Sequence, residues 1–352
     1  MPWGSELDST ILLFLLQDGI TSGAIYALLG LALVLVFAVT RVILIPQGEV
    51  ITFGALTYAT LAAGKVPGTA LLALSMGIVA FGFDMAGGRN AMHARKAARS
   101  LALNVLLPRA IYGLAMTLAG KENSVAVNFL LSIVIVAPIG LYLYRIAYQP
   151  IAHASVLVLL IASVGIHLAL QGLGLVFFGP EGLRGPAISA AAFTIGPLRF
   201  TGQSIGIYAI TIILIVGLWL LFGYTLYGKA LRSTAVNRLG ARIVGIRTSV
   251  SGQFAFLLAA IIGTISGILI VPITTIYYDT GFLIGLKGFV AAIIGGLVSY
   301  PLTAVAAIVV GIVEAFSSFY ASNFKEVIVF TLLLPVLVLR SLASPEVEKE
   351  ND

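Results

Sequence analysis

The sequence contains no cysteine, only three histidines and few charged residues. Without cysteine the chain forms no disulfide and no thiolate metal site, and three separated histidines argue against a metal centre. Charged residues make up 10% of the 352 residues, whereas a soluble domain averages about 25%. This deficit, together with a hydrophobic content of 60%, excludes an ordinary soluble protein and indicates an integral membrane protein.

The residue combinations of common enzymes are also missing. No paired carboxylates, no Ser/His/Asp set and no Glu-x-x-His motif stands out, and His167 lies within an apolar run where a helix-to-helix hydrogen bond is its simplest role. The segment GYTLYGKA, 223–230, has the spacing of a phosphate-binding loop. However, Ala230 stands where Ser or Thr must bind magnesium, so we expect a protein that is not an enzyme and binds no cofactor.

Long apolar runs make up most of the sequence. About 20 apolar residues are needed for a helix to cross roughly 30 Å of hydrocarbon. We predict one all-α polytopic membrane domain over residues 1–352 with about eleven transmembrane helices. The predicted spans are approximately 10–39, 43–63, 66–83, 101–119, 128–147, 154–178, 204–226, 252–276, 281–298, 301–320 and 324–340.

The positive charges between the apolar runs predict the orientation. The formal net charge is +6, but the cations lie in short loops, so membrane topology explains them better than nucleic-acid binding. With the N-terminus outside, eleven spans place the main clusters and the C-terminal tail in the cytoplasm. These clusters are Arg41, residues 89–99, Arg145, residues 229–247 and Arg340. The loop 179–203 is then external, as a docking surface or a connector.

Four ionisable residues lie inside the apolar runs: Asp18, Glu49, Lys287 and Glu314. A charge at bilayer depth is costly and normally faces a cavity or a partner. Gly48 and Glu49 follow Pro46 in LIPQGE, where the helix is interrupted, and interrupted helices often line transport pathways. Lys287 and Glu314 lie on consecutive runs, so an ion pair between them either fixes packing or contacts the substrate.

The cytoplasmic loop 228–250 contains the basic stretch LRSTAVNRLGARIVGIR. Its pattern predicts a short amphipathic helix over 235–244, stopped by Gly245. The apolar face holds Val236, Leu239 and Ile243, and another face holds Arg238 and Arg242. Such a helix lies in the lipid headgroups or inserts into a groove of another protein.

Several segments together resemble a known family. They are GAIYALLGLALVLVF, RIAYQPIA, YGKALRSTAVNRLGARIVGI, GFLIGLKGFVAAIIGGLVSYP and VGIVEAFSSFYASNFKEVIVF. In order and spacing they resemble the permease subunits of branched-chain amino acid ABC importers of the LivH-like type. The resemblance implies an importer permease fold of about nine helices. RIAYQPIA follows five runs here rather than three, which predicts an inserted hairpin around 66–127.

The resemblance also implies what the chain assembles with and transports. It implies two ATP-binding subunits, a second LivM-like permease and a periplasmic or extracellular substrate-binding protein, in the bacterial inner membrane. The implied substrate is a branched-chain or other small hydrophobic amino acid, with some relatives handling urea or short amides. The implied contacts with the ATPase are Ala235, Asn237, Arg238, Ala241, Arg242, Gly245 and Ile246.

Two departures from the family pattern affect these expectations. Family members commonly read Asn-Phe-Ala-His-Gly-Glu where this chain has LIPQGE, which keeps Gly48 and Glu49 but leaves the substrate assignment open. In the coupling segment Asn237 replaces an acidic residue, and arginines are added at 238 and 242. We therefore expect the cognate ATPase groove to be acidic.

A secondary transporter driven by an ion gradient is the main alternative. Its coupling groups would be Glu49, Asp279, Lys287 and Glu314. Hydropathy symmetry between the two halves would favour it, and the sequence shows none that is convincing. A membrane enzyme or a scaffold lacks a candidate constellation, so the leading expectation is a non-catalytic importer permease.

Overall fold

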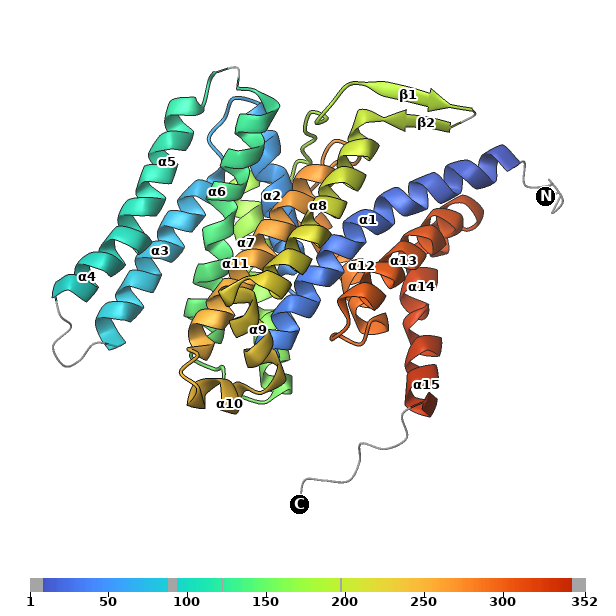
Figure 1. Ribbon diagram of the computed structural model, residues 1–352. Coiled ribbons are helices and arrows are strands. Elements are labelled where there is room, and N and C mark those ends of the chain that lie inside the picture. Colours follow the sequence, from blue (N-terminus) through green and yellow to red (C-terminus); the bar gives the residue numbers. More distant parts are fainter. Residues whose placement is uncertain (1–8, 88–93, 122, 197, 344–352) are drawn as a thin grey trace.

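The structure, a computed structural model, describes residues 9–87, 94–121, 123–196 and 198–343, and these are mostly helical (Figure 1). The helices are α1 (Ser9–Thr40), α2 (Gln47–Ala62), α3 (Gly68–Gly87), α4 (Ala94–Leu101), α5 (Leu107–Leu118), α6 (Val125–Leu143), α7 (Val156–Phe178), α8 (Gly202–Tyr224), α9 (Leu226–Val236), α10 (Arg238–Ile243), α11 (Thr248–Ile270), α12 (Thr280–Ile294), α13 (Tyr300–Tyr320), α14 (Lys325–Thr331) and α15 (Leu333–Ala343). Short π-helical segments, η1 (Ala102–Leu106) and η2 (Tyr144–Tyr148), precede α5 and follow α6.

Nine helical stretches of the described residues are long and apolar enough to cross a membrane. The all-α polytopic class is therefore confirmed, whereas the count of eleven is not. The two predicted spans that fall short are 43–63 and 281–298, which form α2 with 16 residues and α12 with 15. At 1.5 Å per residue these helices reach only about 24 Å, less than the roughly 30 Å of a hydrocarbon core.

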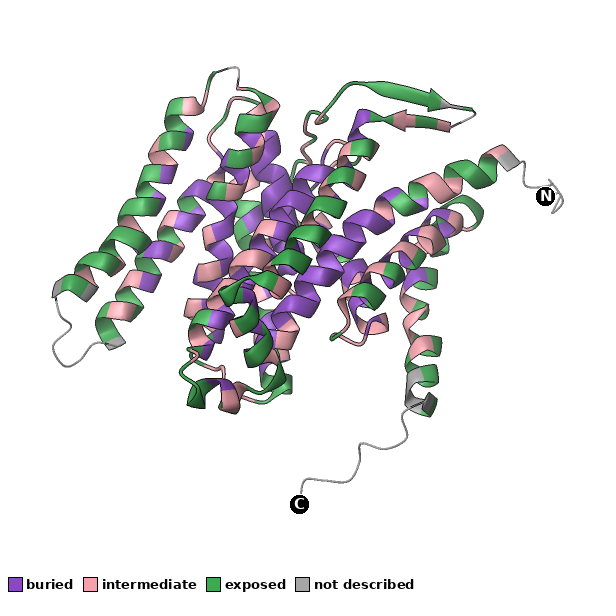
Figure 2. Cartoon of the chain, in the orientation of Figure 1, coloured by how far each residue is buried: buried purple, intermediate pink, exposed green. Residues whose placement is uncertain are grey.

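The core forms where α1 and α11 pack against the shorter helices. Figure 2 shows buried residues concentrated on α1, α2 and α11, whereas α4, α5 and α8 are exposed over much of their surface. Small residues let the backbones approach closely: a Cβ atom on Gly23 would lie 2.7 Å from the Cα atom of Ile308 in α13. Inside a bilayer the hydrophobic effect does not drive helices together. Close packing of this kind therefore holds them in contact.

The same order of elements occurs twice: a long helix, an irregular break and a short helix. Residues 41–46 separate α1 from α2, and residues 271–279 separate α11 from α12. The two short helices begin side by side, because Gly48 of α2 packs on Gly281 and Gly285 of α12. A Cβ atom on Gly48 would lie 2.6 Å from the carbonyl oxygen of Gly281, so only glycine permits this approach.

The loop between α7 and α8 covers the second break. Leu183 and Ile276 exchange two backbone hydrogen bonds of 2.9 Å, and Arg184 donates to the carbonyl oxygens of Pro272 and Ile273. These hydrogen bonds to residues 271–279 hold the predicted loop 179–203 in place. It ends in an antiparallel hairpin, β1 (Ala192–Ile195) and β2 (Leu198–Thr201), with Ala192 opposite Thr201 and Ile195 opposite Leu198.

The region predicted to be an inserted hairpin forms α3, α4, η1 and α5, which lie together at one side of the molecule (Figure 1). The guanidinium of Arg145 joins this region to the rest of the protein. It donates to Asp84 at 2.6 and 2.7 Å and to Asn104 at 2.9 Å. That the region is an insertion relative to the family stays a prediction, and Arg89 and His93 of its basic turn lie outside the described residues.

The predicted span 101–119, which contains Pro108 and Arg109, is helical, with η1 just before its proline. Within η1 the hydrogen bonds reach back five residues, so the N–H of Leu107 donates to Ala102. Pro108 has no N–H to give to the next carbonyl oxygen, that of Leu103. The hydroxyl of Tyr142 donates to it instead, at 3.2 Å.

Enlarging a buried glycine tests the close contact between α2 and α11. A Cβ atom on Gly54 would lie 2.6 Å from the Cα atom of Thr264, so Gly54→Ala should lower the stability of the purified protein by about 1–3 kcal/mol. The midpoint of thermal unfolding in detergent measures the effect. Gly165→Ala is the matched control, because nothing lies within 4 Å of its Cβ position and alanine favours helix by up to about 1 kcal/mol. Equal midpoints for the two variants would contradict the packing described here.

Candidate translocation and coupling sites

Glu49 lies in the first turn of α2, where the two short helices meet. Its side chain is buried, and its Oε1 atom lies 2.7 Å from Nδ1 of His167 in α7. The imidazole stacks on the ring of Phe282 in α12, with 4.5 Å between centroids. His167 thus makes the helix-to-helix hydrogen bond expected of it, and the structure brings Glu49, His167 and both short helices together.

Lys287 of α12 lies at the centre of a buried charged group. Its Nζ atom is 2.5 Å from Oε1 of Glu314 in α13 and 3.1 Å from Oε1 of Glu326 in α14. The hydroxyl of Tyr26 in α1 donates to the other oxygen of Glu314, at 2.5 Å. We call Tyr26, Lys287, Glu314 and Glu326 the Lys287 cluster. The ion pair considered from the sequence is therefore formed, and four helices contribute to it.

Sequence reasoning missed two members of this cluster. Glu326 is an acidic residue within the predicted span 324–340, which was a signal that could have singled it out. The structure divides that span into a 3-10 turn (Ser322–Phe324), α14 and α15, and this path brings Glu326 back toward Lys287. Tyr26 carried no comparable signal, because 288 residues separate it from Glu314.

One cavity is lined by the Lys287 cluster, and a second cavity shares three of its lining residues. The inner cavity, of about 280 Å³, is lined by the cluster and by residues of α1, including Asp18 and Ser22. The outer cavity, of about 610 Å³, lies beneath the loop before β1 and is lined by Arg184 of that loop and Arg199 of β2. Asp18, Thr21 and Ile273 line both cavities.

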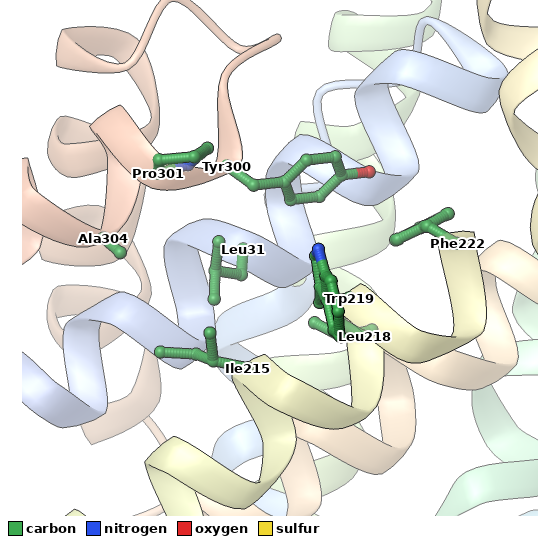
Figure 3. Close-up of a pocket in the computed structure, with 8 residues that line it drawn as sticks. All are labelled: Leu31, Ile215, Leu218, Trp219, Phe222, Tyr300, Pro301 and Ala304. Atoms are coloured by element: carbon green, nitrogen blue, oxygen red, sulfur yellow. The ribbon is translucent and has the colours of Figure 1, made fainter. Parts of the chain in front are cut away.

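An apolar cavity of about 300 Å³ lies elsewhere, between α1, α8 and α13. Figure 3 shows Leu218, Trp219 and Phe222 of α8 together with Tyr300 of α13 around it. Tyrosine and tryptophan supply its only side-chain hydrogen-bonding groups. This lining suits hydrocarbon and offers nothing to hold a charged solute.

The coupling loop forms two helices rather than the single helix predicted over 235–244. Asn237 is extended, with φ −150°, and its side chain accepts a 2.8 Å hydrogen bond from the N–H of Gly240. Asparagine caps a helix better than it continues one, so α9 ends before it and α10 begins after it. The predicted stop is confirmed: Gly245 has φ +86°, and the N–H of Ile246 donates back to Ala241, as in a Schellman motif.

The surface of this loop carries apolar side chains among its positive charges. Four large apolar side chains are exposed there: Val236 at 86%, Leu239 at 69%, Ile243 at 78% and Val244 at 74%. Arg242 is exposed beside them and donates to the hydroxyl of Thr248.

Arg238 differs from Arg242, because it is half-buried and points toward the carbonyl oxygen of Ala152. Burial also lowers the pKa of Arg238. The two arginines, four residues apart on α10, therefore differ in exposure, and Arg242 is the one that faces solvent.

The sequence comparisons identify the family. A model of the family described as "Branched-chain amino acid transport system / permease component" matches residues 15–337. The chain belongs to this family. It is therefore a transport permease, and its apolar helices make it a multi-pass membrane protein. No solved structure matches it.

Curated relatives agree with this assignment. The chain is 29% identical to the high-affinity branched-chain amino acid transport system permease protein LivH of Salmonella typhimurium, over 67% of this chain and 80% of the relative. It is 28% identical to the corresponding protein BraD of Pseudomonas aeruginosa, over 63% of this chain and 75% of the relative. A shorter match, 31% over 39% of this chain and 38% of the relative, is to the autoinducer 2 import system permease protein LsrC of Yersinia enterocolitica. Import permeases named for different substrates are thus similar to this chain.

Removing the charges of the Lys287 cluster should have unequal effects. Lys287→Met leaves two carboxylates facing each other and should cost about 3–5 kcal/mol. Glu314→Gln leaves Glu326 as counter-charge and should cost only about 1–3 kcal/mol. Thermal unfolding of the purified variants in detergent measures both.

Two further variants make this comparison decisive. The double variant Lys287→Met/Glu314→Gln should unfold at a higher temperature than Lys287→Met alone, because one unpaired carboxylate is gone. Lys121→Met, at an exposed position, controls for the loss of a lysine. If Lys287→Met unfolds at the same temperature as Lys121→Met, the cluster does not stabilise the fold.

Proposed function

We propose that the protein is the membrane-spanning subunit of an ATP-driven importer for branched-chain or other small hydrophobic amino acids. The observation that carries the proposal is the family match over residues 15–337, which includes helix α10 with its exposed Leu239 and Ile243. In this proposal the segment 223–230 binds no phosphate, because it forms the end of α8 and the start of α9. ATP is then bound by separate subunits.

The proposed assembly contains two ATP-binding subunits, a second LivM-like permease and an external substrate-binding protein. Figure 1 shows α10 and the end of α15 toward one end of the molecule and β1–β2 with the start of α1 toward the other. This arrangement supports a cytoplasmic side at α10 and an external side at the β-hairpin. The N-terminus is then outside and the C-terminus inside.

We assign the contact with the ATPase to α10 and its flanks. Leu239 and Ile243 supply the apolar anchor, and Arg242 supplies a charge beside it. An amphipathic helix that enters a groove binds through such anchors. Ala235, Asn237, Arg238, Ala241, Gly245 and Ile246 then shape and hold the segment, since Asn237 starts α10 and the motif at Gly245 ends it.

An ion-coupled secondary transporter is the second candidate. The observation that favours it is the presence of three carboxylates, Asp18, Glu314 and Glu326, around the inner cavity with Lys287. Acidic groups in a membrane interior can bind a coupling cation or proton. This candidate requires no ATPase, so contact with an ATPase separates the two.

Acidic substitutions on α10 test the proposed coupling site. Leu239→Asp and Ile243→Asp place charge in the apolar anchor, so each should reduce co-purification of the ATPase subunits at least about tenfold. The yield of ATPase recovered with affinity-tagged permease measures the loss. Reversing the exposed charge in Arg242→Glu should reduce recovery more than the same change at the half-buried Arg238.

Lys229→Glu is the matched control, because Lys229 is exposed on α9 and the change reverses one positive charge in the same loop. It should leave ATPase recovery near that of the unaltered protein. Full recovery with both Leu239→Asp and Ile243→Asp would overturn the docking role of α10.

A further inference from the structure

We infer that the inner cavity is a binding site for the amino acid substrate within this one subunit, with Glu326 and Lys287 as the ligands of its two charged groups. The inference rests on the proposed function and adds to it the place and the chemistry of substrate contact. The lining and size of the cavity and the unequal hydrogen bonding of the Lys287 cluster support it.

The lining matches a zwitterion with an aliphatic side chain. Carboxylates and ammonium groups both face the cavity, so both charged ends of an α-amino acid find opposite charges there. Its apolar wall consists of Ile25, Ile270, Ile273, Leu283 and Ile284. At about 280 Å³ it lies just below the roughly 300–1,000 Å³ range of pockets for drug-sized ligands, as suits a smaller ligand of amino acid size.

The two carboxylates that bind Lys287 are held differently. Glu314 contacts Lys287 at 2.5 Å and receives a second hydrogen bond from Tyr26, so both its oxygens are occupied. Glu326 contacts Lys287 at the longer distance of 3.1 Å, and its buried Oε2 atom has no hydrogen-bond partner among the described residues. Glu326 is therefore the member of the cluster that can exchange partners at least cost.

The different hydrogen bonding of Glu314 and Glu326 indicates how each of them acts when the substrate binds. The substrate ammonium binds the carboxylate of Glu326, and the N–H that Lys287 then has free binds the substrate carboxylate. Glu314 and Tyr26 keep Lys287 in place throughout. Each charged group that loses one ion-pair partner thus gains another partner. This exchange is needed because an unpaired buried charge is costly where little water can solvate it.

The outer cavity provides the route to this site. It shares the lining residues Asp18, Thr21 and Ile273 with the inner cavity, and it is about twice as large. Arg184 and Arg199 line it, so the substrate carboxylate meets positive charge first and the acidic cluster afterwards. A zwitterion can in this way pass from one cavity to the other with its charges facing opposite charges.

Uptake kinetics of the assembled importer in proteoliposomes test the role of Glu326. Glu326→Gln removes one charge-assisted hydrogen bond, so the KM for L-isoleucine should rise roughly 10–100-fold. Glu181→Gln, the same change in the exposed loop before β1, is the matched control and should leave KM unchanged. An unchanged KM in Glu326→Gln would overturn the inference, whereas unaltered protein that transports no amino acid with its ATPases would overturn the proposed function itself.

A labelling experiment tests the cavity independently of any loss of folding in Glu326→Gln. The chain has no cysteine, so Ser22→Cys places a single thiol in the inner cavity and Ala63→Cys places one at an exposed site after α2. L-isoleucine should slow modification of the first thiol by a positively charged methanethiosulfonate at least about tenfold, without slowing that of the second. Isoleucinol and 3-methylpentanoate, which each lack one charged group, should protect weakly. Equal labelling of Ser22→Cys with and without L-isoleucine, or equal protection by all three compounds, would overturn the assignment.

Discussion

A bilayer offers no hydrogen bonds to backbone groups that leave a helix, and this constraint underlies the rest of the structure. Residues 41–46 and 271–279 are two such breaks, and the backbone polar groups of each need hydrogen-bond partners within the protein. Leu183 and Arg184 of the loop before β1 satisfy the second break. At the first break, the N–H of Val42 donates to the hydroxyl of Thr40, and the carbonyl oxygen of Leu44 accepts from the N–H of Gln47.

The breaks also explain where polar side chains gather. Because α2 and α12 start side by side, Glu49, His167 and Phe282 meet at one point and Lys287 lies one to two turns further along α12. Burying these groups costs free energy that pairing has to offset. We propose that these charged groups belong to a transport pathway, because apolar residues would be enough for a packing role alone.

The apolar runs and the Lys and Arg positions were sufficient to predict an all-α polytopic membrane protein. They could not separate full spans from the short helices α2 and α12, since Gly48, Gly281 and Gly285 matter only through contacts between distant segments. The pairing of Glu49 with His167 was likewise hidden, because 118 residues separate them. Asn237 was different: its capping preference was readable in the sequence, and giving it weight would have predicted two helices in the coupling loop.

The central claim is that ATP hydrolysis by partner subunits drives transport through this chain. Accumulation of radiolabelled L-isoleucine in proteoliposomes containing the permeases, the ATPases and the binding protein tests it most directly. The account predicts accumulation with ATP and no ion gradient, and none with a proton or sodium gradient in the absence of ATP. Accumulation that follows the ion gradient and ignores ATP would contradict it.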